Sequence, residues 1–123
     1  MAVGKRILLV DDAMFMRAVL KHILITNGYD IVGEASNGLQ GVEQYKELSP
    51  DLVILDMTMD ELDGLGAARL IKEYDPNAKM LMCSAMLGQR KILEEALEAG
   101  AVDVIAKPFD KEKLLEVVAK IFE

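Results

Sequence analysis

Five short apolar runs, each followed by a longer segment with helical spacing of apolar residues, constrain the fold of this chain more than any other feature. Apolar runs without alternation are typical of strands buried on both faces, as in parallel sheets. Consecutive parallel strands need a crossover, which the amphipathic segments can supply. The sequence therefore predicts an α/β domain with a doubly wound parallel sheet. The expected strands are residues 7–10, 30–35, 52–55, 79–83 and 102–106.

The helical segments have recognisable ends. Asn37 and Asp110 can cap helices, because a side-chain oxygen there can accept a hydrogen bond from a free backbone N–H group. Gly28 and Gly100 can end helices in the left-handed conformation. The expected helices lie between Met16 and Asn27, from Asn37 to about Leu48, after Gly64, from about Gly88 to Ala99 and after Asp110.

The composition excludes several classes of protein. The 123 residues fit one domain, and 14 basic against 21 acidic side chains give a net charge of −7. This charge argues against unspecific binding to nucleic acid or to anionic lipid. The only cysteine, Cys83, cannot form an internal disulfide, and no apolar run approaches the ~20 residues of a membrane span. The sequence shows no signal peptide, and we expect a cytoplasmic protein without membrane insertion.

Five polar residues whose side chains could bind a ligand or take part in chemistry lie at the ends of the expected strands: Asp11, Asp12, Asp56, Ser84 and Lys107. Each alone is commonplace, as a helix cap, a loop hydroxyl or a surface lysine. The carboxyl ends of parallel strands, however, meet at one edge of the sheet, where doubly wound proteins bind their ligands. Three carboxylates at close range repel one another unless a cation neutralises them, and Mg²⁺ prefers such oxygen ligands with water and phosphate.

These residues stand in motifs that resemble the receiver domains of bacterial response regulators. The motifs are Leu9-Val10-Asp11-Asp12, Leu55-Asp56, Cys83-Ser84-Ala85 and Lys107-Pro108-Phe109, and the resemblance covers the whole chain. The segment Asp11 to Arg17 is more narrowly similar to the chemotaxis regulators of this family. The resemblance implies a flavodoxin-like fold with strand order 2-1-3-4-5 and five helices. It also implies a single receiver domain over residues 1–123, with no output domain.

The resemblance also implies roles for the site residues. Asp56 matches the aspartate that a histidine kinase phosphorylates, Lys107 the lysine that pairs with the phosphoryl oxygens, and Ser84 the hydroxyl that moves toward them. For the metal, it implies ligation of Mg²⁺, or of Mn²⁺ in its place, by Asp12, Asp56 and the backbone carbonyl of Thr58, with Asp11 acting through water. The Lys107–Pro108 peptide bond matches one that is cis in the family.

The implied partners are a histidine kinase and, for a chemotaxis regulator, a flagellar motor switch protein and a phosphatase. We expect a monomer that signals through a separate protein and that modifies itself instead of turning over a substrate.

Two residues depart from the family pattern, one near the moving hydroxyl and one near the acidic pocket. Val104 stands where receivers carry an aromatic residue, and Asp60, which we interpret as solvent-facing, stands where they carry proline.

Other residues of possible functional interest have simpler structural interpretations, and three alternative functions differ from a phosphorylated receiver. His22 is interpreted as a surface histidine, Cys83 as core, and Met59 and Met86 as lying at the pocket rim. A flavin-binding electron carrier would need hydroxyl and backbone N–H groups that donate hydrogen bonds to a phosphate, whereas the chain has the carboxylates Asp11 and Asp12 at this place. A phosphatase with an aspartyl-phosphate intermediate would need a general acid near the nucleophile, commonly two residues after it, where this chain has Thr58. A degenerate receiver that works without phosphorylation is the third alternative, which Val104 keeps open.

Overall fold

The computed structural model describes residues 4–57, 59, 62–85 and 90–123. Strands and helices alternate along the chain, as the apolar pattern predicts. The strands are β1 (Arg6–Val10), β2 (Asp30–Ala35), β3 (Leu52–Asp56), β4 (Met80–Ser84) and β5 (Asp103–Ala106). The helices are α1 (Met14–Thr26), α2 (Gly38–Leu48), α3 (Gly64–Tyr74), α4 (Arg90–Glu98) and α5 (Lys111–Ile121).

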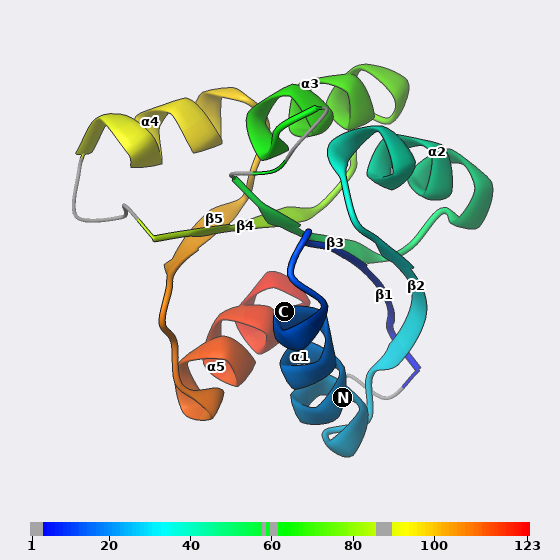
Figure 1. The fold of residues 1–123 in the computed structure, drawn as a ribbon, viewed down its shortest axis with the longest axis vertical. Helices are drawn as coiled ribbons and strands as arrows, with labels where there is room; N and C mark the ends of the chain where they lie inside the picture. The colour runs from blue at the N-terminus through cyan, green and yellow to red at the C-terminus, as the bar shows by residue number, and fades with distance from the viewer. Residues whose placement is uncertain (1–3, 58, 60–61, 86–89) are drawn as a thin grey trace.

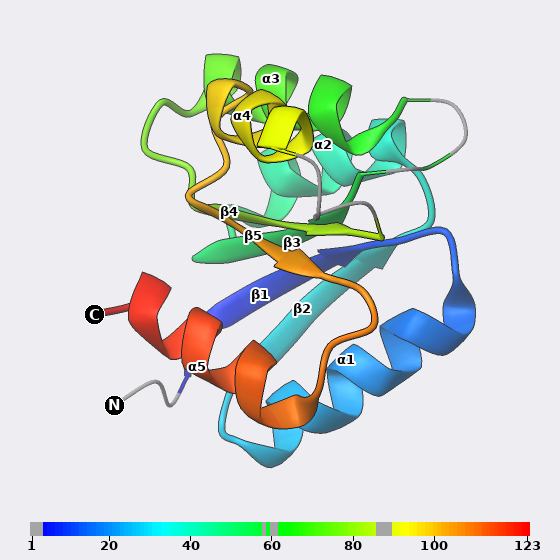
Figure 2. The ribbon, with the colours of Figure 1, turned by 90° about the vertical axis from the view of Figure 1, so that its left-hand side faces the viewer.

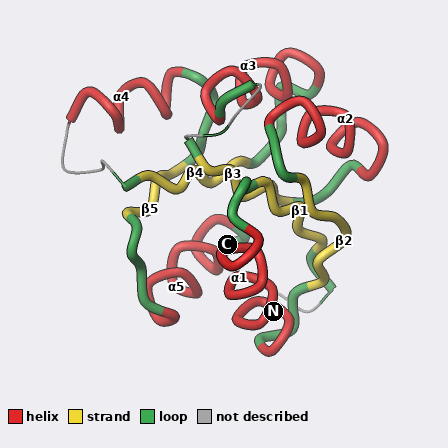
Figure 3. The backbone as a smooth tube through the Cα atoms, in the orientation of Figure 1, coloured by secondary structure: helices red, strands yellow, loops and turns green. Residues whose placement is uncertain are grey.

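The strands form one parallel sheet in the order β2-β1-β3-β4-β5, which confirms the predicted topology. Helices α2, α3 and α4 cover one face, and α1 and α5 cover the other (Figures 1 and 2). The tube in Figure 3 shows the same arrangement as a layer of strands between two layers of helices. Strand order reverses between β1 and β3, so a ligand site is expected at the carboxyl ends of these strands.

Alternation along each strand divides the core into two layers. Leu8, Val10, Val53, Leu55 and Met82 belong to the apolar cluster on the α2–α4 side. The intervening residues, among them Ile7, Leu9, Leu52, Ile54 and Cys83, belong to the cluster under α1 and α5. Burial on both faces explains why the strands read as continuous apolar runs in the sequence.

Two predicted helix caps are confirmed, and one further cap was missed. The side chains of Asn37 and Asp110 accept hydrogen bonds from the N–H groups of Gln40 and Lys113. Asp63 caps α3 in the same way, accepting from the N–H of Gly66. An aspartate directly before the first helical residue, three residues before the N–H group that donates to it, is the sequence signal that could have identified it.

Several boundaries differ by a residue from the prediction. β1 begins at Arg6, whose N–H donates to the Asp51 carboxylate at 2.8 Å. β5 begins at Asp103 and not at Val102, whose side chain is 46% exposed and outside the core. β4 runs from Met80 through Ser84 instead of 79–83. The predicted start of α4 near Gly88 lies outside the described residues.

The remaining interpretations of single residues can be compared with the structure. His22 is exposed, and Cys83 is buried, where desolvation raises the pKa of its thiol to about 12. Both interpretations are confirmed. Met59, predicted at the pocket rim, is instead buried in the cluster on the α2–α4 side, because its apolar side chain packs between sheet and helices. Met86 lies outside the described residues. Among the helices described, none is long and apolar enough to cross a membrane.

Candidate functional site

The strand pleat determines which predicted site residues meet. Val10 and Leu55 point into the α2–α4 layer, so the next residues, Asp11 and Asp56, turn to the α1–α5 side. Lys107 directly follows β5, and its ammonium reaches both of these carboxylates. Ser84, one residue after Cys83, turns to the opposite side. The sheet thus brings two carboxylates and one ammonium together across three strands.

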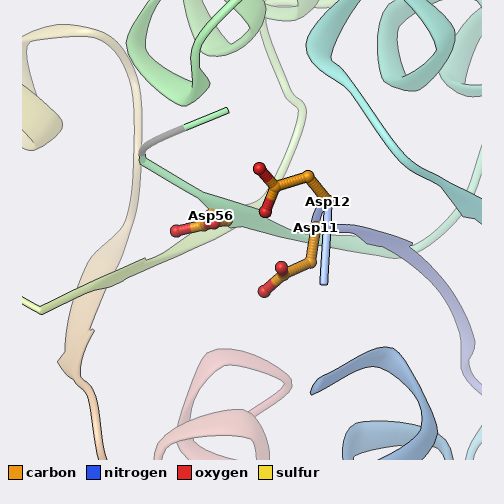
Figure 4. Close-up of side chains that lie close together, drawn as sticks. All are labelled: Asp11, Asp12 and Asp56. Atoms are coloured by element: carbon orange, nitrogen blue, oxygen red, sulfur yellow. The ribbon is translucent and has the colours of Figure 1, made fainter. Parts of the chain in front are cut away.

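Three carboxylates gather at the ends of β1 and β3 (Figure 4). Asp11, Asp12 and Asp56 each contribute an oxygen atom, and these atoms lie within 4.8 Å of one another. Asp11 is only 3% exposed and Asp56 only 9% exposed, whereas Asp12 faces solvent. The cluster therefore combines two poorly hydrated carboxylates with one accessible from outside.

Lys107 bridges the two buried carboxylates. Its Nζ lies 3.0 Å from Oδ2 of Asp11 and 3.2 Å from Oδ1 of Asp56. Burial alone would lower the pKa of the ammonium, but the hydrogen bond to Asp11 and the charge of Asp56 raise it above its usual value. The lysine is therefore held in its charged form beside Asp56. Its following peptide bond, Lys107–Pro108, is cis, as the resemblance implies.

The loop between β1 and α1 is fixed by its own hydrogen bonds. The Asp11 N–H donates to the carbonyl of Ala35 at the end of β2, at 3.0 Å. The Ala13 N–H donates to Oδ1 of Asp11 at 2.9 Å. Nη1 of Arg17 donates to the Asp11 carbonyl at 2.6 Å, and its Nε donates to Glu34. Arg17 and Glu34 were not predicted as site residues, because their contact depends on how α1 sits beside β2.

Ser84 is buried at 4% exposure, and its carbonyl accepts a hydrogen bond from the N–H of Lys107 at 2.9 Å. Val104 lies opposite Met82 in the pairing of β4 and β5 and is 7% exposed. It belongs to the cluster on the α2–α4 side, the side to which Ser84 turns. Thr58 and Asp60, the predicted carbonyl ligand and the predicted solvent-facing acid, lie outside the described residues.

Gly64 at the start of α3 is a second feature that the sequence interpretation missed. A Cβ atom at this position would lie 2.2 Å from the backbone oxygen of Asp56 and 2.8 Å from Cα of Met57. The Gly64 N–H also donates to the Met57 carbonyl at 3.1 Å. Absence of a side chain therefore lets α3 approach the backbone that carries Asp56.

The donor set suits a hard divalent cation. Mg²⁺ binds oxygen at about 2.0–2.1 Å, so two ligands of one ion lie up to about 4.2 Å apart. Carboxylate oxygens within 4.8 Å of one another need only small side-chain rotations to share an ion. A cation would also offset the repulsion that one lysine leaves among three carboxylates. The residues present therefore fit the metal that the sequence predicts.

Comparisons with known proteins show the family of the chain. Residues 7–119 match the model of the response regulator receiver domain. The chemotaxis protein CheY of Thermotoga maritima is 51% identical, over 96% of this chain and 98% of that protein. CheY of Bacillus subtilis is 53% identical, over 94% of this chain and 95% of that protein.

Solved structures show the same fold. One is a crystal structure of a CheX–CheY–BeF₃–Mg²⁺ complex from Borrelia burgdorferi, with a TM-score of 0.94, 34% identity, and coverage of 98% of this chain and 91% of that one. The response regulator domain of Thermotoga maritima CheB has a TM-score of 0.86 at 37% identity, covering 97% of this chain and 94% of that one. The chain therefore belongs to the response regulator receiver family and is similar, within it, to the CheY proteins of chemotaxis-type two-component signalling.

Proposed function

We propose that this chain is a phosphoacceptor response regulator of a chemotaxis system, which accepts a phosphoryl group on Asp56 from a histidine kinase. The observation that carries the proposal is the position of Asp56. Its carboxylate lies at the end of a central strand, beside the Lys107 ammonium and within 4.8 Å of the oxygens of two further aspartates. A nucleophile, a cation for the phosphoryl oxygens and ligands for a metal are therefore assembled at one place.

In this proposal an Asp56 carboxylate oxygen attacks the phosphorus of a phosphohistidine. The new oxygen–phosphorus bond forms as the phosphorus–nitrogen bond breaks, and the electron pair returns to the imidazole of the kinase. Lys107, held charged beside Asp56, stabilises the negative charge on the transferring oxygens. Catalysis then consists of positioning and charge neutralisation, which is what phosphoryl transfer requires.

Asp12 and Asp56, with the carbonyl of Thr58, would hold Mg²⁺ or Mn²⁺, and Asp11 would contribute through water. When bound, the cation supplies positive charge that neutralises the phosphoryl oxygens and orients them in line. Ser84 would then move toward those oxygens and couple phosphorylation to a change of shape. Each of these roles rests on the family resemblance together with the positions of Asp11, Asp12, Asp56 and Ser84.

The partners follow from the same proposal. A receiver needs a kinase that supplies the phosphoryl group and a separate protein that receives the signal. For a CheY-type regulator we infer a flagellar motor switch protein as the receiver of the signal and a phosphatase that ends it. We place the protein in the cytoplasm as a monomer, and we expect one phosphorylation and one dephosphorylation per cycle instead of turnover of an external substrate.

Intact-mass measurement after incubation with a small phosphodonor and Mg²⁺ tests the proposal. The wild-type protein should gain one phosphoryl group, and the gain should be absent when EDTA removes the metal. Asp56→Asn, which preserves the size of the side chain, should gain none. A wild-type protein that stays unmodified under these conditions would support the alternative of a degenerate receiver that works through contacts alone.

A further inference from the structure

Arg17 joins the acidic loop to the edge strand of the sheet. Its Nη1 donates to the backbone carbonyl of Asp11 at 2.6 Å, and its Nε lies 3.1 Å from Oε1 of Glu34 on β2. The second oxygen of Glu34 lies 2.7 Å from Nζ of Lys21, one turn further along α1. We name this set, Arg17, Glu34 and Lys21, the loop clamp.

The contact with Asp11 bears on the position of Asp12. The hydrogen bond from the Asp11 N–H to the Ala35 carbonyl ties the start of this loop to the end of β2. The next peptide group, from the Asp11 carbonyl to the Asp12 nitrogen, is planar, so fixing its oxygen fixes the direction in which the chain proceeds to Asp12. The contact with Arg17 therefore constrains the peptide group that leads to Asp12, the solvent-facing carboxylate of the cluster.

The anchor of the clamp is rigid. Glu34 pairs with Leu9 in the sheet register, and its own carbonyl accepts a hydrogen bond from the side chain of Gln44 on α2. The hydrogen bond from Lys21 and that from Arg17 lower the pKa of the Glu34 carboxyl, although burial acts in the other direction. Glu34 thus stays ionised and keeps the guanidinium turned toward the loop.

Arginine suits this position better than lysine. The planar guanidinium donates in fixed directions from Nε and Nη1, which lets one side chain hold a carboxylate and a carbonyl at once. The Arg17 side chain is 15% exposed, so the contact is shielded from water to a greater extent than an ordinary surface pair. Arg90 and Glu94 on α4 form such a surface pair, with side chains 91% and 64% exposed.

We propose that the loop clamp positions Asp12 for metal binding, and hence that Arg17 is a positioning residue for phosphorylation of Asp56. The inference rests on the proposed function, since it assumes that the acidic cluster binds Mg²⁺. Partners that orient the ligands of a metal typically change its affinity by about 10–100-fold when they are removed. We expect the lower end for Arg17→Ala, because Arg17 acts through the backbone and not on the carboxylate.

The test is Mg²⁺ titration of the folded variants, followed by amide NMR shifts. Arg17→Ala should weaken Mg²⁺ binding about tenfold. Arg17→Lys keeps the positive charge but not the two fixed donor directions of the guanidinium, so its Mg²⁺ affinity should lie between those of the wild type and Arg17→Ala. Lys21→Ala, which removes only the outer pair, should change the affinity less than either. Arg90→Ala, which breaks the exposed pair on α4 and touches none of the clamp residues, is the matched control and should leave the affinity unchanged.

A purely structural role makes a different prediction. In that case Arg17→Ala lowers the melting temperature but leaves the Mg²⁺ affinity of the folded protein as in the wild type, which would overturn the inference. If Arg17→Ala does not fold, Arg17→Lys and Glu34→Gln provide the same comparison. Wild-type protein that fails to bind Mg²⁺ would refute the proposed function itself. The positioning role of Arg17 can then be tested without metal, by comparing the amide shifts of Arg17→Lys with those of the wild type. Unchanged shifts at Asp12 and Ala13 would refute that role as well.

Discussion

The two edges of the sheet differ in how they arrange charge. At the carboxyl edge, Asp11, Asp12 and Asp56 lie close together, and the ammonium of Lys107 contacts two of them, Asp11 and Asp56. The amino edge holds a hollow of about 200 Å³ lined in part by Lys5, Tyr45, Asp75, Lys79 and Phe122. The side chains that line this hollow carry charges of both signs.

The polar groups of the amino edge have partners within the fold. The Tyr45 hydroxyl donates to the Asp75 carboxylate at 2.8 Å, and the ammonium groups of Lys5 and Lys79 lie 5.5 and 5.9 Å from the centre of the Phe122 ring. At the carboxyl edge, like charges accumulate beyond what one lysine can balance. Among the residues that the structure describes, accumulated like charge therefore distinguishes the carboxyl edge of this sheet from the amino edge.

The largest expected difference between the edges is in phosphorylation rate. Lys107→Met keeps the length of the side chain but removes the charge beside Asp56, so labelling by a small phosphodonor should slow by ~100-fold. Lys79→Met makes the same change at the amino edge and should leave the rate unchanged. Time courses of intact mass measure both. Equal rates for the two variants would show that the charge at the carboxyl edge plays no part in transfer.

Close packing beneath Asp56 should make the carboxyl edge sensitive to a single methyl group. Gly64→Ala places a Cβ against the Asp56 backbone oxygen, and we expect the free energy of unfolding to fall by about 1–3 kcal/mol. Gly66→Ala is the matched control, since its Cβ meets the end of the Leu62 side chain, which can move. Urea denaturation should show little loss for Gly66→Ala, and an equal loss in both variants would contradict the packing argument.

Repulsion within the acidic cluster should show as a gain in stability when one charge is removed. Asp12→Asn should raise the free energy of unfolding of the metal-free protein by about 0.5–1 kcal/mol, a modest value because Asp12 faces solvent. Added Mg²⁺ should stabilise the wild type but not the variant. Asp110→Asn is the control, because asparagine caps α5 as well as aspartate does. Destabilisation of metal-free Asp12→Asn would refute the repulsion.

The smallest expected change is at Val104. This side chain is β-branched and stiff at χ1, and it is buried opposite Met82, so it cannot make the large swing of an aromatic ring. With a phosphoryl mimic bound, the amide shifts of Ala85, Arg90 and Lys91 should change markedly, while the Val104 methyl shifts change little. A rotamer change at Val104 with constant shifts in the flanking residues would contradict this view of the switch.

Local patterns in the sequence predicted the α/β class and the gathering of the candidate site residues at one edge, whereas the strand order was implied by the family resemblance. Apolar runs identify buried strands, and the residues that follow them reach one edge whatever the details of packing. The caps at Asn37 and Asp110 were predicted for the same reason, since a cap involves residues three apart.

Features that depend on contacts between distant segments were not predicted. The ion pair of Arg17 with Glu34 requires α1 to lie along β2. The steric requirement at Gly64 appears only when α3 returns over the end of β3. The rim position of Met59 is predicted from its closeness in sequence to Asp56, whereas its side chain is buried in the cluster on the α2–α4 side.

Chemical mapping of the phosphorylated residue tests the central claim most directly. Borohydride reduces an acyl phosphate to the alcohol, so a phosphorylated aspartate becomes homoserine and can be located by peptide mass spectrometry. After treatment with a small phosphodonor and Mg²⁺, homoserine should be found at position 56 and at no other aspartate. Homoserine at position 11 or 12, or label retained on another residue in Asp56→Asn, would contradict the account.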